Sequence, residues 1–148
     1  MSGWLVDTNV LSELRRPRPK AEVAAFISGL PLEDLYASAV TFAEIRFGIE
    51  LVPDAARRSE LALWLENQLR PMFDGRVLPI TEDILLKWRL IIEDGRRRGH
   101  TFAHPDVLIA ATAAHHGLTV VSRDESEFAA AGVAIFNPWT GQAPRHNP

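Results

Sequence analysis

The chain contains no cysteine among its 148 residues. This absence excludes structural disulfides, thiolate zinc sites and cysteine nucleophiles, so any bound metal must take oxygen or imidazole ligands. No apolar run approaches the roughly 20 residues of a membrane-spanning helix. The first residues also lack the basic segment and long apolar stretch of a secretory signal. We therefore expect a cytoplasmic protein that does not associate with membranes.

An excess of positive charge is also absent, because the formal net charge is −3 at pH 7. Tight, indiscriminate binding to nucleic acid depends mainly on basic residues that neutralise phosphates, so the composition argues against it. A nuclease that engages a few phosphates locally is compatible with this charge.

The length and the 47% apolar content favour a single domain over residues 1–148, with an irregular tail from about residue 137.

Short apolar segments alternate with helical patterns along the chain. Strands are expected at 4–6, 35–37, 76–80, 118–122 and 133–136, and the internal Pro79 favours an edge position for the third. Helices are expected over 8–15, 20–29, 38–50, 54–71, 81–98 and 104–115, with a short Ala-rich helix before the last strand. This alternation predicts an α/β fold with a doubly wound, mainly parallel five-stranded sheet flanked by helices.

Acidic residues accompany the ends of these strands. Asp7 directly follows the first strand, Asp124 follows the fourth, and Glu44 lies on the helix after the second. Asp106 opens a helix after the connection 99–104, and six extended residues span about 20 Å, enough to return the chain to the same edge. Ligands bind at that edge in open parallel α/β sheets, so we expect the four carboxylates to converge there.

Three of these acids also have a structural explanation when each is taken alone. Asp7 is placed to cap the following helix, which stabilises by about 1 kcal/mol, and Asp106 lies in a first helical turn, where acids are favoured. Thr41 and Glu44 match a capping box, although Ser38 could cap the same helix and leave Glu44 without that role. The sequence alone leaves both interpretations of Glu44 open.

Four converging carboxylates would repel one another strongly unless a cation neutralised them. Hard oxygen ligands, with no cysteine and no evident histidine cluster, select Mg²⁺ or Mn²⁺ rather than zinc.

Two basic segments are candidates for phosphate contact. The segment 15–20 contains two prolines that also suit a turn and a helix start, and the three arginines at 96–98 also suit the end of a helix.

Four fragments together resemble the PIN-domain ribonucleases, in particular the VapC/FitB-like toxins of bacterial toxin–antitoxin pairs. They are LVDTNVLSE (5–13), SAVTFAEIRFGI (38–49), DVLIAATA (106–113) and VSRDESEF (121–128). Their order and spacing cover residues 4 to about 137. The resemblance implies a PIN-like fold in which catalysis and metal binding fall to Asp7, Glu44, Asp106 and Asp124. It also implies supporting polar roles for Thr8, Asn9, Ser122 and Glu127.

One departure from the family concerns the last acid. Many members have asparagine where this chain has Asp124, and aspartate where it has Glu127. Either side chain could therefore approach the metal. We favour Asp124 because it comes directly after the strand.

The resemblance also implies an activity and its partners. The activity is endonucleolytic, Mg²⁺-dependent hydrolysis of RNA phosphodiester bonds, without a side-chain nucleophile. The partners are RNA, a second copy in a homodimer, and a small antitoxin with a DNA-binding N-terminus, assembled into a larger toxin–antitoxin complex. The antitoxin tail would send a basic side chain into the acidic crevice and rest on apolar positions that include Phe26 and Trp64.

Three other classes of function fit parts of the sequence: a processing nuclease, a phosphoaspartyl protein and a binding module. An RNA-processing PIN nuclease without an antitoxin would carry the same acids. A Mg²⁺-dependent phosphoaspartyl phosphatase wants a second aspartate two residues after Asp7, where this chain has Asn9, and a receiver domain wants an acidic pair and a late lysine that are absent. A non-catalytic binding module has no need of four intact carboxylates.

Overall fold

Five short strands form one sheet in the computed structural model, which describes residues 3–141. They are β1 (Trp4–Val6), β2 (Leu35–Ser38), β3 (Val77–Leu78), β4 (Thr119–Val121) and β5 (Ile135–Phe136). Their order across the sheet is β3-β2-β1-β4-β5, and each adjacent pair runs parallel. The predicted parallel sheet is thereby confirmed, and β3 lies at its edge.

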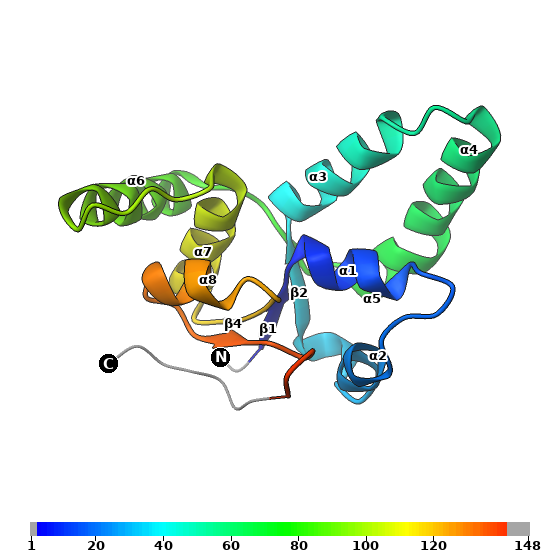
Figure 1. Cartoon of the computed structure of the whole chain (residues 1–148), viewed down its shortest axis with the longest axis horizontal. Coiled ribbons are helices and arrows are strands. Elements are labelled where there is room, and N and C mark those ends of the chain that lie inside the picture. The colour runs from blue at the N-terminus through cyan, green and yellow to red at the C-terminus, as the bar shows by residue number, and fades with distance from the viewer. Residues whose placement is uncertain (1–2, 142–148) are drawn as a thin grey trace.

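Helices cover both faces of this sheet (Figure 1). One side carries α1 (Thr8–Leu14), α2 (Ala21–Ser28), α3 (Ala39–Glu50), α4 (Ala55–Trp64) and α5 (Arg70–Met72). The other carries α6 (Glu82–Arg97), α7 (His104–His116) and α8 (Glu125–Ala130). A 3₁₀ turn, η1 (Leu32–Asp34), precedes β2, and a π-helical segment, η2 (Leu65–Leu69), joins α4 to α5. This arrangement is the doubly wound α/β fold that the sequence predicts.

Neighbouring residues of β1 pack into two different cores, as the alternation of side chains along a strand requires. Val6 packs with Leu11 and Phe73 on the side of α1. Leu5 packs with Phe128 on the side of α7 and α8. The helix α7 approaches closely because it presents small, fully buried side chains at Ala110, Ala111 and Ala113. The sheet is therefore buried on both faces, which explains why its strands are so apolar.

The chain changes its direction across the sheet between β1 and β4. From the central β1 it proceeds to β2 and β3 on one side, and later to β4 and β5 on the other. Connections that leave two neighbouring strands in opposite directions open a crevice at their carboxyl ends. Asp7 follows β1 and Ser122 follows β4, and the Asp7 amide donates to the Val121 carbonyl oxygen at 2.9 Å. Both side chains therefore stand at the base of this crevice.

Local signals determine where the helices begin and end. The hydroxyl of Ser38 accepts a hydrogen bond from the Val40 amide and caps α3, and the hydroxyl of Thr81 caps α6 in the same way. At the end of α6, Arg96 and Arg97 pair with Glu93 of the preceding turn, at 2.6 and 3.7 Å. Arg96 and Arg97 therefore lie in the last turn of α6, where basic side chains are favoured, and pair with an acid of the same helix.

The helix expected over 54–71 is one helical path with a wider turn inside it. Pro71 has no N–H to donate, and its ring would collide with the carbonyl four residues earlier in a regular α-helix. The Arg70 amide donates to the Leu65 carbonyl, five residues earlier, which gives the π-helical geometry of η2. The proline thus explains why α4 does not continue unchanged into α5.

The described end of the chain, residues 137–141, contains no helix or strand. Asn137 is nevertheless buried there, and Trp139 packs against the core. Residues 142–148, the rest of the predicted tail, lie outside the described residues. Over residues 3–141, none of the helices combines the length and the apolar character needed to cross a membrane.

Candidate active site

Three carboxylates from distant parts of the chain meet in the crevice between β1 and β4. Asp7 follows β1, Asp106 lies in the first turn of α7, and Asp124 precedes α8. Each offers an oxygen within 4.8 Å of the other two. Asp7 is buried, Asp106 is half-buried and Asp124 is exposed, and all three line a cleft of about 320 Å³. The structure therefore brings together three of the four acids that the sequence singles out for metal binding.

The carboxylate of Asp7 accepts two short hydrogen bonds and a longer one, at 3.5 Å, from the Asn9 amide nitrogen. One oxygen accepts from the Thr8 amide at 2.8 Å, which makes Asp7 the N-cap of α1. The other oxygen accepts from the Ser122 hydroxyl at 2.7 Å. Capping and a place in the acidic cluster are thus not alternatives for this residue, because one side chain occupies both positions.

A small polar network joins the two strand ends behind the acids. The Asn9 amide nitrogen lies 3.1 Å from the Ser122 hydroxyl and 3.3 Å from an Asp124 carboxylate oxygen, and it donates to both. The Ser122 hydroxyl also accepts from the Asp124 amide at 3.0 Å. One hydroxyl can donate once and accept twice, so Ser122 is fully used in holding this turn. Asn9 and Ser122 therefore fix Asp7 and Asp124 relative to one another.

Glu44 lies on the second turn of α3, on another wall of the same cleft. Because Ser38 caps α3, the capping box with Thr41 is not formed. The Glu44 carboxylate instead accepts from the Thr8 hydroxyl at 3.1 Å. In the described chain it stands outside the three-acid group, but it faces the same space.

Glu127 is placed differently from the other predicted residues. It lies on α8, where its carboxylate accepts from the Ala103 amide at 3.0 Å and contacts His100 at 3.2 Å. It lines an adjoining cleft that shares Asp106, Arg123 and Asp124 with the first. The structure thus brings Asp124, rather than Glu127, into the group with Asp7.

Burial and mutual repulsion raise the pKa values of two acids in the cluster. Burial raises the pKa of Asp7 to about 6, and the negative charges of Asp124 and Glu44 contribute, while two hydrogen bonds to its carboxylate oppose the rise. Burial also raises the pKa of Asp106 to about 7, with further increases from Asp7, Asp124 and Glu127. Without a cation, the cluster therefore holds protons near neutral pH.

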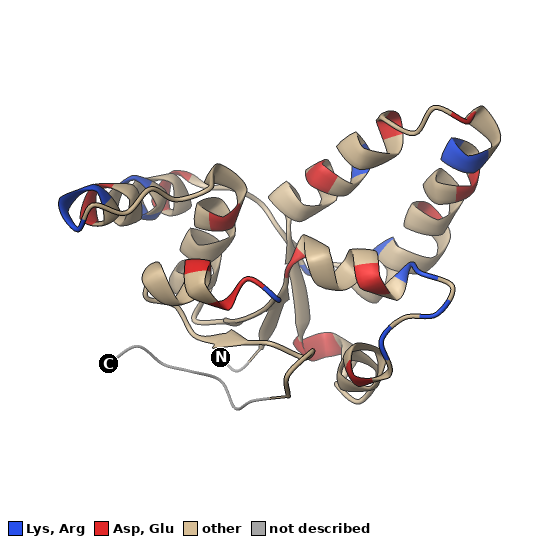
Figure 2. Cartoon of the chain, viewed as in Figure 1, with Lys and Arg blue, Asp and Glu red and all other residues tan. Residues whose placement is uncertain are grey.

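Residues outside the set predicted from the sequence also line the cleft. Glu13 is buried there, one turn after Asn9 on α1, and Arg16 pairs with it at 3.7 Å. Arg123 lines the cleft beside Asp124, with its guanidinium 4.6 Å from the ring centre of Trp139. The helical spacing of Asn9 and Glu13 could have indicated their shared face, and the basic segment at 15–20 includes Arg16. Figure 2 shows basic positions next to acidic ones at the end of α1 and in the loop before α8.

An apolar groove adjoins the acidic cleft between α1, α3 and α4. It shares Thr8, Ser12 and Glu44 with the cleft. Its apolar lining is Ile45, Ile49, Val52, Leu61 and Trp64. Trp64 thus lies where the sequence suggested a partner surface. Phe26 does not line this groove, because its ring stacks on Phe136 with the centroids 4.4 Å apart.

Comparison with known proteins gives consistent matches over most of the chain. The family model of the PIN domain matches residues 4–133. The toxin FitB of Neisseria gonorrhoeae is 44% identical over 135 residues, which are 91% of this chain and 97% of that protein. The VapC ribonuclease Y4jK of Sinorhizobium fredii is 41% identical, covering 91% of this chain and 96% of that protein. The structure of FitAB bound to the IR36 DNA fragment superposes with a TM-score of 0.88 at 40% identity, covering 97% of this chain and 99% of that one.

Proposed function

This chain belongs to the PIN-domain family, and from that premise we propose that it is a metal-dependent endoribonuclease that acts as the toxin of a toxin–antitoxin pair. The observation that carries the proposal is the convergence of Asp7, Asp106 and Asp124 within 4.8 Å at the crevice between β1 and β4. The relatives described as the toxin FitB and a VapC ribonuclease support the biological role.

The donor set fits a hard divalent cation. All three groups offer oxygen, and hard oxygen ligands favour Mg²⁺ or Mn²⁺. Burial and the neighbouring negative charges raise the pKa values of Asp7 and Asp106, and a divalent cation would offset the repulsion among these carboxylates. Asp7, Asp106 and Asp124 would hold the ion. When bound, it supplies Lewis acidity that activates water and offsets negative charge on a phosphodiester.

The remaining side chains orient the reacting groups. Ser122 and Asn9 hold the carboxylates of Asp7 and Asp124 in place, as outer partners of metal ligands do. Glu44 is held by Thr8 on another wall, where its carboxylate can accept a proton from water or serve as a fourth acid near the ion. No serine or threonine is needed as a nucleophile in this scheme.

The substrate proposed for the cleft is RNA. Arg16 and Arg123 line the cleft beside the acids and can contact phosphates on either side of the bond that is cut. Two local cations are compatible with the overall charge of −3, which does not favour indiscriminate binding along a long nucleic acid.

We further propose a protein partner for the groove that contains Trp64. A small antitoxin with a DNA-binding N-terminus would place its tail there, next to Glu44, and would join two copies of this chain into a larger assembly on DNA. The similar structure of FitAB bound to the IR36 DNA fragment supports the assembly on DNA. The apolar lining of the groove suits an apolar segment of such a tail.

The test of the activity is cleavage of single-stranded RNA by the purified chain with Mg²⁺ or Mn²⁺, and with EDTA. Asp7→Asn should abolish cleavage and leave the circular dichroism spectrum unchanged, because asparagine also caps helices well. Asp74→Asn, a substitution at an exposed aspartate away from the cleft, is the matched control and should cleave like the wild type. Full activity of a folded Asp7→Asn variant, or activity in EDTA, would overturn the proposal.

A further inference from the structure

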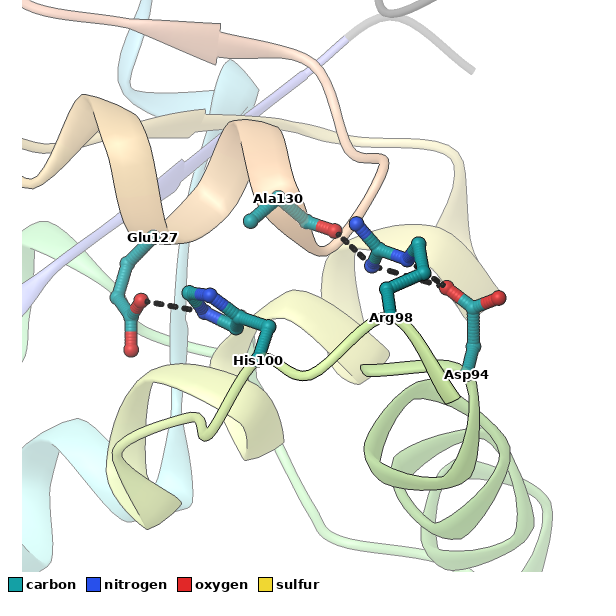
Figure 3. Close-up of polar contacts among 5 residues, drawn as sticks. All are labelled: Asp94, Arg98, His100, Glu127 and Ala130. Carbon is teal, nitrogen blue, oxygen red and sulfur yellow. Dashed lines mark hydrogen bonds and ion pairs between the residues drawn. The ribbon is translucent and has the colours of Figure 1, made fainter. Parts of the chain in front are cut away.

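The loop that leads into α7 contacts α8 through the carboxylate of Glu127 (Figure 3). One oxygen of Glu127 lies 3.2 Å from Nε2 of His100. The other oxygen accepts from the Ala103 amide at 3.0 Å. Because a carboxylate only accepts hydrogen bonds, the first contact requires a proton on Nε2 of His100. Both oxygens of Glu127 are thus engaged by the loop.

This contact bears directly on Asp106. Ala103 is the N-cap of α7, and Asp106 is the third residue of the helix. In a capping box, the acid at this third position reaches back and accepts the amide of the N-cap residue. Here Glu127 accepts that amide from another helix. The carboxylate of Asp106 is therefore left for the cleft, where it lies close to Asp7 and Asp124.

Further contacts hold the same loop. The guanidinium of Arg98 donates to the Ala130 carbonyl of α8 at 2.9 Å and pairs with Asp94 at 2.9 Å (Figure 3). The ring of His100 packs edge-on against Phe102 with the centroids 4.3 Å apart. The connection between α6 and α7 is thus attached to α8 at both of its ends. Glu127 makes the attachment nearest to Asp106.

We propose that Glu127 is a positioning residue, which fixes the start of α7 and hence the carboxylate of Asp106 without binding the metal itself. The inference rests on the proposed function, because it presumes an ion held by the three acids. Outer partners that orient metal ligands typically contribute a factor of about 10 to 100 in metal affinity or activity. Glu127 would act at this level through the Ala103 amide.

The first test is Mn²⁺ binding to the full chain, measured by isothermal titration calorimetry. Glu127→Ala should weaken binding by about 10- to 100-fold. Glu127→Gln should stay close to the wild type, because its amide oxygen accepts from Ala103 and its NH₂ group can donate to His100 in the other tautomer. Glu125→Ala is the matched control, since it removes one negative charge from the same helix and leaves the contacts of Glu127 with His100 and Ala103 in place.

The second test follows the loop itself by hydrogen–deuterium exchange without metal. Glu127→Ala should accelerate exchange over residues 99–106, and Glu127→Gln and Glu125→Ala should not. Equal behaviour of Glu127→Ala and Glu125→Ala would overturn the inference. So would a loss of Mn²⁺ affinity in Glu127→Gln with an unchanged loop, because that result identifies a metal ligand.

Two results separate this inference from the proposed function. If the wild-type chain binds no Mn²⁺ and cuts no RNA, the proposed function is overturned, and so is the effect of Glu127 on metal affinity. Hydrogen–deuterium exchange would still show whether Glu127 holds the loop. A wild-type chain that binds and cuts, with no effect of Glu127→Ala, overturns only the inference. If Glu127→Ala fails to fold, the Mn²⁺ affinity of Glu127→Gln decides between ligand and positioning residue.

Discussion

Glu44 is the residue whose two interpretations the structure separates most clearly. A capping glutamate would lie at the third position of α3 and would bond back to the helix start. Glu44 lies further along the helix, Ser38 provides the cap, and the Glu44 carboxylate meets the Thr8 hydroxyl at 3.1 Å. The side chain is therefore not needed for the start of α3. Its carboxylate lines the cleft that contains the other three acids.

Glu44→Gln should therefore separate activity from stability. RNA cleavage should fall by about 100-fold or more if the carboxylate takes a proton or stands near the ion. The melting temperature should stay close to the wild type, since glutamine can still accept from Thr8. Glu50→Gln, at the exposed end of α3, is the control and should change neither quantity. A fully active Glu44→Gln variant would remove Glu44 from the site.

The sequence predicts residues at strand ends more readily than residues on helix faces. Asp7 and Asp124 follow buried strands, so the geometry of a parallel sheet is enough to assign them to one edge. Glu13 and Arg16 line the same cleft only because α1 turns that face toward it. The placement of Glu127 depends on the path of an irregular loop, which no periodic pattern encodes.

At the scale of elements, periodicity predicts the helices and strands but not their irregular parts. The wider turn of η2 follows from Pro71. A proline at this position is equally compatible with a kink or with the end of the helix, so the sequence alone does not predict the wider turn. The connection between α6 and α7 depends on Gly95, because a β-carbon there would lie 2.5 Å from the Phe102 ring and 3.1 Å from the His100 carbonyl. That close approach is a tertiary contact, which explains why the sequence pattern alone did not reveal it.

Gly95→Ala should therefore destabilise the protein, although alanine is the better helix former. Alanine gains about 1 kcal/mol in an open helix, but overpacking costs about 1 to 3 kcal/mol, and here a backbone carbonyl also lies close. Gly48→Ala in α3 meets no atom within 4 Å and should stabilise by about 0.5 to 1 kcal/mol. Urea unfolding measures both variants. Equal stabilisation by the two alanines would contradict the close packing of Phe102.

For the whole molecule, the acidic cluster makes stability depend on pH and on metal. Asp7 and Asp106 have folded-state pKa values of about 6 and 7, above their ordinary value of 3.8. Between about pH 4 and 7 the folded chain therefore binds more protons than the unfolded chain, so the free energy of unfolding falls as pH rises through this window. Above about pH 7 both carboxylates are ionised in the folded and the unfolded chain, so they cause no further change in the free energy of unfolding.

Divalent metal should counteract this loss. Carboxylates must be ionised to bind the ion, so Mg²⁺ should stabilise the chain more at pH 8 than at pH 5. Urea unfolding at pH 5, 6, 7 and 8, in EDTA and in Mg²⁺, measures both effects. Asp7→Asn is the control and should show a smaller fall between pH 5 and 7, because the group with the raised pKa near 6 is gone. Metal-free stability that rises over this range would contradict the assignment.

The surface around the cleft bears on how a partner could control the enzyme. Apolar side chains on α3 and α4 remain exposed, among them Phe47 at 65% and Leu63 at 62%. The groove that contains Trp64 runs from these helices to Glu44, where it joins the acidic cleft. The alternating pattern of the sequence predicts the sheet, but this surface depends on how α1, α3 and α4 pack against one another. The sequence could therefore predict that a partner binds apolar helix positions, but not which residues form the groove.

Inhibition by an antitoxin should therefore compete with metal. A guanidinium from the partner's tail can form a bidentate pair with the carboxylates that would otherwise hold Mg²⁺, and such pairs are among the stronger hydrogen-bonded contacts. Inhibition of RNA cleavage, measured at a fixed partner concentration, should weaken as Mg²⁺ rises. Replacing the partner's inserted arginine by alanine should restore cleavage even where the complex still forms through the apolar groove, as size-exclusion chromatography would report. A complex that still cleaves RNA at low Mg²⁺ would exclude this mechanism. So would inhibition that changes neither with the Mg²⁺ concentration nor with replacement of the arginine.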